Sequence, residues 1–180
     1  NIVIMLLIIT GGIGFFVMWE VKHWFEFRKK RYRPSLHTKV VLITTFILIT
    51  GGAGIIWLLE IHNNGLGSNP FSRILPAIFQ SVTCRTAGFN TVDLTCYGND
   101  TVLFMMFLMF VGASPGSCGG GIKTTTAAVI FALFWSRVRG GSLTNIFKRT
   151  LSADLIGRSL GVAVAAAIIL VIGNVLLMMT

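Results

Sequence analysis

One short segment of the sequence carries residue types suited to binding a cation with its backbone. It reads Thr83-Cys-Arg-Thr-Ala-Gly-Phe-Asn90. Gly88 can take a positive φ without steric cost, and Asn90 is one of the few other residue types that tolerate the left-handed region. A backbone with this freedom can turn successive carbonyls toward one axis, where they replace the water around a dehydrated ion such as potassium. The segment therefore predicts a backbone ion-binding loop.

The apolar stretch before this loop, residues 74–82, is too short to cross a bilayer, which takes about 20 apolar residues. A short helix that enters from outside points its C-terminus, the negative end of its dipole, toward the membrane interior. That orientation favours a cation at the loop.

A second unusual segment is Gly112-Ala-Ser-Pro-Gly-Ser-Cys-Gly-Gly-Gly-Ile-Lys123, which interrupts the otherwise uncharged run 101–136. A straight helix over that run would be about 54 Å long, well beyond the ~30 Å hydrocarbon core. Its glycines and its proline remove helix propensity. We therefore predict a broken transmembrane helix over 101–136, with a loop at 112–123 that is buried in protein or lines a water-filled path.

Enzymatic interpretations of these segments fail on residue identity. A phosphate-binding loop needs Gly before its Lys, where Ile122 stands. Gly112-Ala-Ser-Pro-Gly116 superficially resembles the serine motif of rhomboid proteases, which need a later His as base, and the three histidines all lie upstream (His23, His37, His62). No His or carboxylate follows Thr101 within 101–126 to hold a transition metal. We predict that the protein is not an enzyme.

The composition is that of a membrane protein. Of 180 residues, 54% are hydrophobic and 12% charged, against about 25% charged in soluble domains, and the mean hydropathy is +0.80. The net charge of +9 is concentrated in 20–39 and 137–158, next to apolar runs, which is the pattern of positive charge that flanks transmembrane helices. We expect these charges to face the cytoplasm and anionic lipid, and we expect no nucleic-acid partner.

Three further apolar runs are predicted to be transmembrane helices, over 1–19, 39–60 and 159–180. The distribution of Lys and Arg then sets the topology, because positive charge collects on the cytoplasmic side. Loops 20–38 and 137–158 are predicted to be cytoplasmic and 61–100 extracytoplasmic. For both basic loops to share one side, the apolar stretch within 71–90 must enter the membrane and return.

The two motifs together resemble one family. Thr86-Ala-Gly-Phe-Asn90 is similar to a potassium-channel filter, and Phe79-Gln-Ser-Val-Thr-Cys-Arg-Thr-Ala-Gly-Phe-Asn-Thr-Val-Asp93 resembles the third pore repeat of the Trk/Ktr potassium transporters. Gly112 to Thr126 resembles the intramembrane loop of the same repeat. The resemblance implies an all-α fold of helix–pore loop–helix repeats. Residues 1–180 would be a fragment of one membrane domain, from the end of repeat two to the start of repeat four.

The resemblance also implies roles for individual residues. The potassium filter would comprise Thr83, Thr86, Ala87, Gly88, Phe89 and Asn90, with the carbonyls of Thr86, Ala87 and Gly88 coordinating the ion. Arg85 would brace the filter by bonding to loop carbonyls. The gate loop would comprise Gly112, Ala113, Ser114, Pro115, Gly116, Ser117, Gly119, Gly120, Gly121 and Lys123, with hydroxyls of Ser114, Ser117 and Thr124 satisfying freed backbone groups and Lys123 facing the pore or the cytoplasmic vestibule. A purely structural turn, a plain helix kink and an outward-facing Arg85 stay open as alternatives.

The function implied is potassium uptake across a bacterial inner or plasma membrane, through a backbone-carbonyl filter gated by the glycine-rich loop. The resemblance further implies a homodimer, a cytoplasmic nucleotide-binding regulatory subunit and no organic cofactor. Sodium stays open as a coupling ion. A sodium-selective or other monovalent-cation pore, a packing-only membrane scaffold, symport and a Cys84–Cys96 bridge also stay open. A near-repeat, Ile9-Thr-Gly-Gly-Ile-Gly14 and Ile49-Thr-Gly-Gly-Ala-Gly54, is interpreted as small residues that let helices pack closely.

Overall fold

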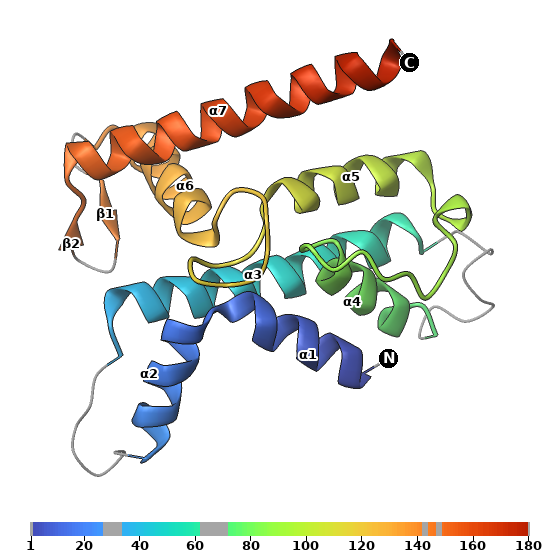
Figure 1. The fold of residues 1–180 in the computed structure, drawn as a ribbon, viewed down its shortest axis with the longest axis horizontal. Helices are drawn as coiled ribbons and strands as arrows, with labels where there is room; N and C mark the ends of the chain where they lie inside the picture. Colours follow the sequence, from blue (N-terminus) through green and yellow to red (C-terminus); the bar gives the residue numbers. More distant parts are fainter. Residues whose placement is uncertain (1, 27–33, 62–71, 142–143, 147–148, 180) are drawn as a thin grey trace. The chain divides into compact units, whose positions relative to one another are not determined.

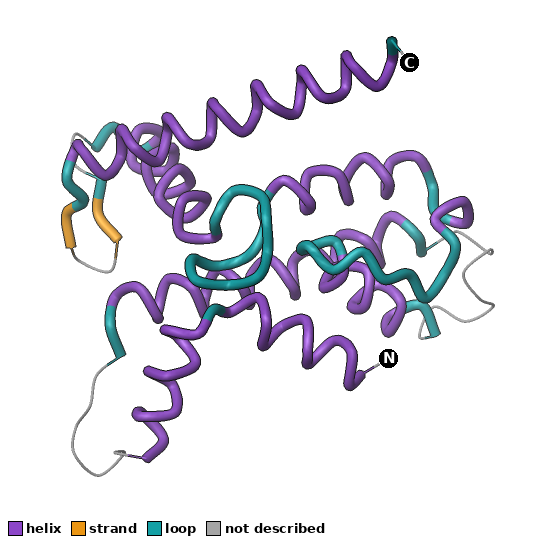
Figure 2. The backbone as a smooth tube through the Cα atoms, viewed as in Figure 1, coloured by secondary structure: helices purple, strands orange, loops and turns teal. Residues whose placement is uncertain are grey.

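The computed structural model describes residues 2–26, 34–61, 72–141, 144–146 and 149–179. The chain divides into two compact units, residues 1–124 and 125–180 (Figures 1 and 2). The helices of the first unit are α1 (Ile2–Ile13), α2 (Phe15–Glu26), α3 (Leu36–Leu59), α4 (Ile74–Thr83), a 3-10 turn (Leu94–Cys96) and α5 (Asn99–Phe110). Helix α6 (Thr124–Val138) begins where the second unit begins, and β1 (Asn145–Ile146), β2 (Arg149–Thr150) and α7 (Ala153–Met178) follow.

Two helices, α3 and α7, are each long and apolar enough to cross a membrane. Both begin at a serine N-cap: the Ser35 hydroxyl accepts from the Thr38 N–H, and the Ser152 hydroxyl accepts from the Leu155 N–H. These caps start α3 and α7 a few residues before the predicted spans 39–60 and 159–180. Of the residues in α7, none is buried within the chain, which leaves its apolar surface free for lipid or protein.

The predicted single helix over 1–19 differs from the structure. The chain bends by 101° between α1 and α2, and Gly14, at the break, has a φ of +86°. A side chain at Gly14 would be strained at this φ, and its Cβ would lie 2.6 Å from the Pro115 carbonyl oxygen. Contact with a distant part of the chain therefore accompanies the bend, and the pair counts as at most one span.

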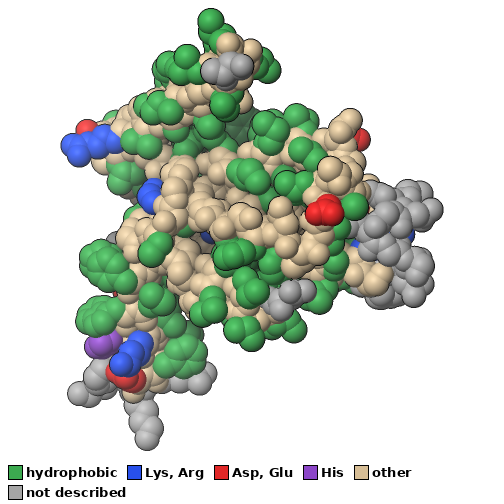
Figure 3. Space-filling view, turned by 45° about the vertical axis from the view of Figure 1, so that its right-hand side comes forward, with side chains coloured by type: hydrophobic (Ala, Val, Ile, Leu, Met, Phe, Trp, Pro, Cys, Tyr) green, Lys and Arg blue, Asp and Glu red, His purple; other side chains and the backbone are tan. Residues whose placement is uncertain are grey.

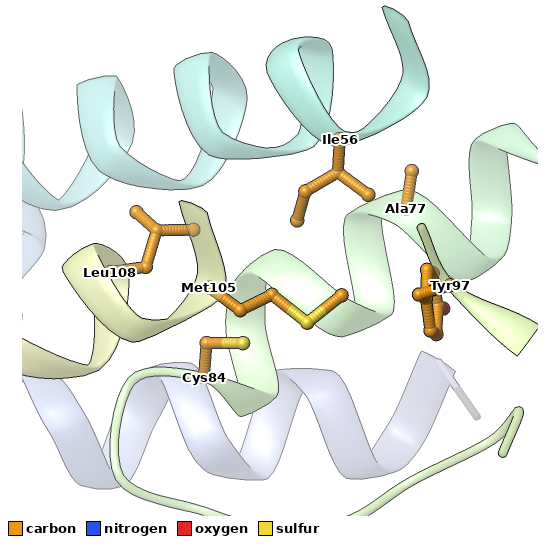
Figure 4. Packing of buried hydrophobic residues seen from close by; sticks show 6 residues of the cluster. All are labelled: Ile56, Ala77, Cys84, Tyr97, Met105 and Leu108. Carbon is orange, nitrogen blue, oxygen red and sulfur yellow. The ribbon is translucent and has the colours of Figure 1, made fainter. Parts of the chain in front are cut away.

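Helix α4 is the centre of the first unit. Six of its ten residues are buried, and it packs chiefly on α3 and also on α1. The close approach to α3 depends on Gly52, because a Cβ there would lie 2.5 Å from the Ser81 hydroxyl oxygen, which itself donates to the Ile49 carbonyl at 3.0 Å. The core joins α3, α4 and α5 through six residues (Figure 4): Ile56, Ala77, Cys84, Tyr97, Met105 and Leu108. This packing fixes the end of α4, where the predicted ion-binding loop starts.

The surface agrees with a membrane environment. Large hydrophobic side chains are exposed along the helices, and many are visible in Figure 3. Apart from the two-residue antiparallel pair β1–β2, the regular structure in the described ranges is helical. The prediction of an all-α membrane fold is confirmed. The predicted interruption of 101–136 is also present, because α5 ends at Phe110 and α6 begins at Thr124.

Some predictions fall partly outside the described residues. These are the middle of the 20–38 loop, residues 62–71 of the predicted extracytoplasmic segment, parts of 137–158, and the terminal residues of 1–19 and 159–180. The sidedness of these loops stays a prediction. Cys84, Cys96 and Cys118 are all free thiols, so the structure has no Cys84–Cys96 bridge.

Candidate ion-binding site

The loop that follows α4 is fixed at both ends by the same residue, Thr83. Its carbonyl accepts from the N–H groups of Ala87 (3.1 Å) and Gly88 (3.3 Å), which ends the helix. Its hydroxyl donates to the Phe89 carbonyl at 2.7 Å. Thr83 and Phe89, predicted to flank the ion, thus have carbonyls that are occupied by the chain itself.

The three carbonyls predicted to coordinate the ion lie between these anchors and differ from them in hydrogen bonding. In the described part of the chain, no hydrogen bond reaches the carbonyls of Thr86, Ala87 or Gly88. Thr86 and Gly88 are exposed and Ala87 is half-buried, so the loop is open on one side. Backbone carbonyls that are free of the chain on an open side of the loop are available to coordinate a cation.

The backbone conformation of this loop is unusual. Thr86 has a φ of +86° and Gly88 a φ of +75°, and Thr86 is the only non-glycine residue with positive φ in the described ranges. For a β-branched residue this is an outlier that costs about 1–3 kcal/mol, and such strain is found mainly at functional sites. Alternating positive φ reverses successive peptide planes, so neighbouring carbonyls can face one side. The sequence pointed to Gly88 and gave no signal for Thr86, since threonine normally avoids this region.

Arg85 is buried, with 7% of its surface exposed. Its Nε has no hydrogen-bond partner in the described part of the chain, and no bond from its guanidinium to a loop carbonyl is found there. The predicted hydrogen bonds from Arg85 to loop carbonyls are therefore not found among the described residues. The role of Arg85 stays a prediction.

A buried carboxylate, that of Glu60, connects the helices around α4. Glu60, 2% exposed, follows α3 and accepts from the Gly98 N–H at 2.9 Å and from the Thr101 hydroxyl, which fixes it to the start of α5. Arg73, just before α4, donates to the Glu60 carbonyl at 3.0 Å. Burial, with a contribution from Glu60, raises the pKa of Tyr97 to about 12. Glu60 thus ties together the three helices that position the loop.

The second predicted segment, 112–123, is folded back on itself. The Gly112 N–H donates to the Ile122 carbonyl at 3.0 Å, and the Ile122 N–H donates to the Phe110 carbonyl at 3.1 Å. A Cβ on Gly112 would overlap the Gly120 carbonyl oxygen, so only glycine fits this crossing. Gly116 and Gly121 have positive φ. The abundance of glycine thus serves close backbone approach as well as turns.

Side chains predicted to satisfy the freed backbone do so in part. The Ser117 hydroxyl donates to the Ser114 carbonyl at 2.5 Å, whereas the Thr124 hydroxyl donates to the buried Ser114 hydroxyl at 3.1 Å. The Lys123 ammonium donates to the Gly119 carbonyl at 2.6 Å. This bond identifies a partner for Lys123 that the sequence could not supply, because the partner is a backbone atom.

The two segments meet at Gly119. A Cβ on this residue would overlap the Ala113 side chain and lie 2.7 Å from the Thr86 hydroxyl oxygen. The 112–123 loop therefore contacts Thr86, the strained residue of the candidate ion-binding loop, directly. Asn90, the last residue of the predicted filter, is exposed. Contact of the predicted filter residues with an ion stays a prediction.

The site and the fold define a class of protein: a helical membrane protein in which a short helix leads into a loop with free carbonyls, beside a helix interrupted by a glycine-rich loop. A family model described as TrkH, cation transport protein, matches residues 1–180. The chain belongs to the TrkH family of cation transport proteins. This membership agrees with the prediction of a transport protein rather than an enzyme.

Curated relatives support the same assignment. The Ktr system potassium uptake protein B of Vibrio alginolyticus is 42% identical over 97% of this chain and 38% of its own length. The Ktr system potassium uptake protein D of Bacillus subtilis strain 168 is 38% identical over 97% of this chain and 38% of its own. The potassium/sodium uptake protein NtpJ of Enterococcus hirae is 32% identical over 88% of this chain and 34% of its own. The chain thus spans under two fifths of the length of these relatives.

Proposed function

We propose that residues 1–180 contribute one part of the ion path of a potassium uptake protein in a cell membrane. The carbonyls of Thr86, Ala87 and Gly88 take the place of water around a dehydrated potassium ion. The observation that carries this proposal is the set of three carbonyls without hydrogen bonds beside two residues with positive φ. The names of the Ktr relatives, which are potassium uptake proteins, support potassium as the ion.

In the same proposal, the 112–123 loop is the gate. Its contact with Thr86 through Gly119 supports this role, because a loop seated there lies at the ion-binding carbonyls. Residues 71–90 form the pore helix and filter, which enter the membrane and return to the extracytoplasmic side. The basic loops 20–38 and 137–158 face the cytoplasm, where anionic lipid and a nucleotide-binding regulatory subunit contact them. The transporter is a homodimer.

A second candidate is transport of both potassium and sodium. The name of the NtpJ relative, a potassium/sodium uptake protein, favours it. The two candidates differ only in the discrimination between ions, so one experiment separates them. Sodium or proton coupling is not part of either proposal.

The test uses a full-length subunit that contains this sequence, in cells without their own potassium uptake systems. Gly88→Ser should reduce discrimination against sodium, because a side chain at a φ of +75° is strained and shifts the neighbouring carbonyls. Gly54→Ser is the matched control, since a Cβ on this mid-helix glycine has no neighbour within 4 Å. Unchanged discrimination in Gly88→Ser would contradict the filter, and sodium uptake by the parent would favour the second candidate.

A further inference from the structure

The near-repeat in the sequence has two different structures. In the second copy, Gly54 lies inside the continuous helix α3, and a Cβ there has no neighbour within 4 Å. In the first copy, Gly14 has a φ of +86° and separates α1 from α2. The same local pattern therefore continues a helix in one place and breaks it in the other, and contacts outside the motif must account for the difference.

Those contacts come from the 112–123 loop. The Gly12 carbonyl, at the end of α1, accepts from the Ser114 N–H at 3.0 Å. The Phe15 N–H, at the start of α2, donates to the Gly116 carbonyl at 3.3 Å. Both groups are backbone groups freed by the break, and both are satisfied by the loop.

The fit around the break is close. The Pro115 carbonyl oxygen would lie 2.6 Å from a Cβ on Gly14, and the rings of Phe15 and Phe16 lie beside Gly116. Ser114 is fully buried at this contact. The loop is thus held on one side by the α1–α2 break and meets Thr86 on the other side through Gly119.

Helix α2 also links the contact with the 112–123 loop to the start of α3. The Glu20 carboxylate accepts from the Ser35 N–H at 2.9 Å and from the hydroxyls of Ser35 and Thr38, which fixes α2 to the start of α3. An open pocket of about 430 Å³ is lined by these residues together with Phe16, Trp19, Pro115 and Gly116. The pocket borders the contact between α2 and the loop.

We propose that the α1–α2 break is the docking position of the 112–123 loop and that Gly14 is the positioning residue that keeps the loop seated against Thr86. In this arrangement, a displacement of α2 removes the Phe15–Gly116 hydrogen bond and releases the loop. The consequence for flux depends on the proposed role of the loop as a gate, whereas the docking itself does not.

A disulfide tests the docking without reference to transport. A Cβ on Gly12 would lie 3.9 Å from the Ala113 Cβ, which is within the usual 3.5–4.5 Å for a bridge. The variant Gly12→Cys with Ala113→Cys, made in the full-length subunit without Cys96 and Cys118, should form a disulfide in native membranes, detected by mass spectrometry of unreduced peptides. Gly54→Cys with Ala113→Cys is the matched control and should not form one. Failure of the first pair to form a disulfide, or equal formation by both pairs, would overturn the docking.

Adding Gly14→Ala to the first pair tests the positioning role. The strain at positive φ and the clash with Pro115 should slow disulfide formation by about tenfold, while Gly54→Ala should leave it unchanged. An unchanged rate with Gly14→Ala would show that Gly14 does not position the loop. If Gly14→Ala prevents membrane insertion, Gly14→Asn, which tolerates positive φ but still carries a Cβ, replaces it with the same expectation.

Potassium uptake then separates this inference from the proposed function. Gly14→Ala should raise resting uptake several-fold over Gly54→Ala, and oxidation of the Gly12–Ala113 cysteine pair should lower uptake until a reductant is added. A disulfide that forms without changing potassium uptake would leave the docking standing and contradict the gate. Absence of potassium uptake by the parent would contradict the proposed function, and the disulfide result would still decide the docking.

Discussion

The two irregular segments of the first unit differ in how their backbone carbonyls are hydrogen-bonded. Between the anchors Thr83 and Phe89, three successive carbonyls have no hydrogen bond in the described part of the chain. In the 112–123 loop, the carbonyls of Ser114, Gly119 and Ile122 accept hydrogen bonds from within the loop, and those of Ala113 and Gly116 accept from the Thr124 and Phe15 N–H groups outside it. The three carbonyls of the first segment are therefore free of the chain, whereas the second segment is held in place through five of its carbonyls.

The strain in the two segments differs in the same way. Positive φ in the second loop falls on Gly116 and Gly121, which adopt it at no steric cost, whereas in the first segment it falls on Thr86 as well as on Gly88. A segment that stores strain and leaves carbonyls free is suited to coordination. A segment whose two ends are bonded to each other, as the Gly112 N–H and the Ile122 carbonyl are, can move as a unit. The following predictions test this division of roles.

The largest effect is expected at Gly112. Gly112→Ala places a Cβ on the Gly120 carbonyl oxygen, and the 112–123 loop cannot close around it. We expect a loss of about 3 kcal/mol or more in the stability of the transporter, measured as a lower midpoint of thermal unfolding in detergent. Gly120→Ala is the control in the same loop, because a Cβ there has no neighbour within 4 Å. Equal midpoints for the two variants would show that the crossing is not as tight as the structure has it.

The next effect is expected at Lys123. Lys123→Met keeps most of the side-chain volume and removes the charged hydrogen bond to Gly119, which is worth about 1.5–3 kcal/mol. Because that bond holds the part of the loop that contacts Thr86, resting potassium uptake should rise. Lys22→Met, which removes only an exposed Lys22–Glu26 pair, should leave uptake at the parent level. Uptake that falls in Lys123→Met would contradict a loop that restricts flux.

The sequence allowed the positions of these two segments to be predicted, but not their contacts or their strain. The interruption of 101–136 was predictable because five glycines and a proline in twelve residues cannot continue a helix. The ion-binding loop was located by Gly88, whose conformational freedom is a property of the residue itself. The partner of Lys123 and the strain at Thr86 could not be predicted, because both arise from backbone atoms that folding brings together.

The break at Gly14 is the clearest feature that the sequence could not predict. Its motif is nearly identical to the one around Gly54, and both motifs predict a helix whose small residues allow close packing. That interpretation suits the second copy, where Gly52 lets α4 approach α3. It misses the break in the first copy, because the hydrogen bonds that stabilise the break come from Ser114 and Gly116, about 100 residues further along the chain.

A smaller effect is expected at the anchor of the first segment. Thr83→Val keeps the shape of the side chain but leaves the Phe89 carbonyl without its donor, at a cost of about 1–3 kcal/mol. Because this hydrogen bond fixes the far end of the loop, potassium-over-sodium selectivity should fall while insertion stays normal. Thr83→Ser retains the hydroxyl and should retain selectivity. If Thr83→Ser and Thr83→Val are equally selective, the hydroxyl does not anchor the loop.

The smallest effect, and the one that separates strain from coordination, is expected at Thr86. Thr86→Gly removes the positive-φ penalty and should raise stability by about 1 kcal/mol, seen as a higher midpoint of thermal unfolding. Ala87→Gly, at a neighbour without positive φ, should lower stability instead. If strain holds the free carbonyls in place, Thr86→Gly gains stability and loses potassium selectivity together. A variant that is more stable and equally selective would mean that the strain serves only the contact with Gly119.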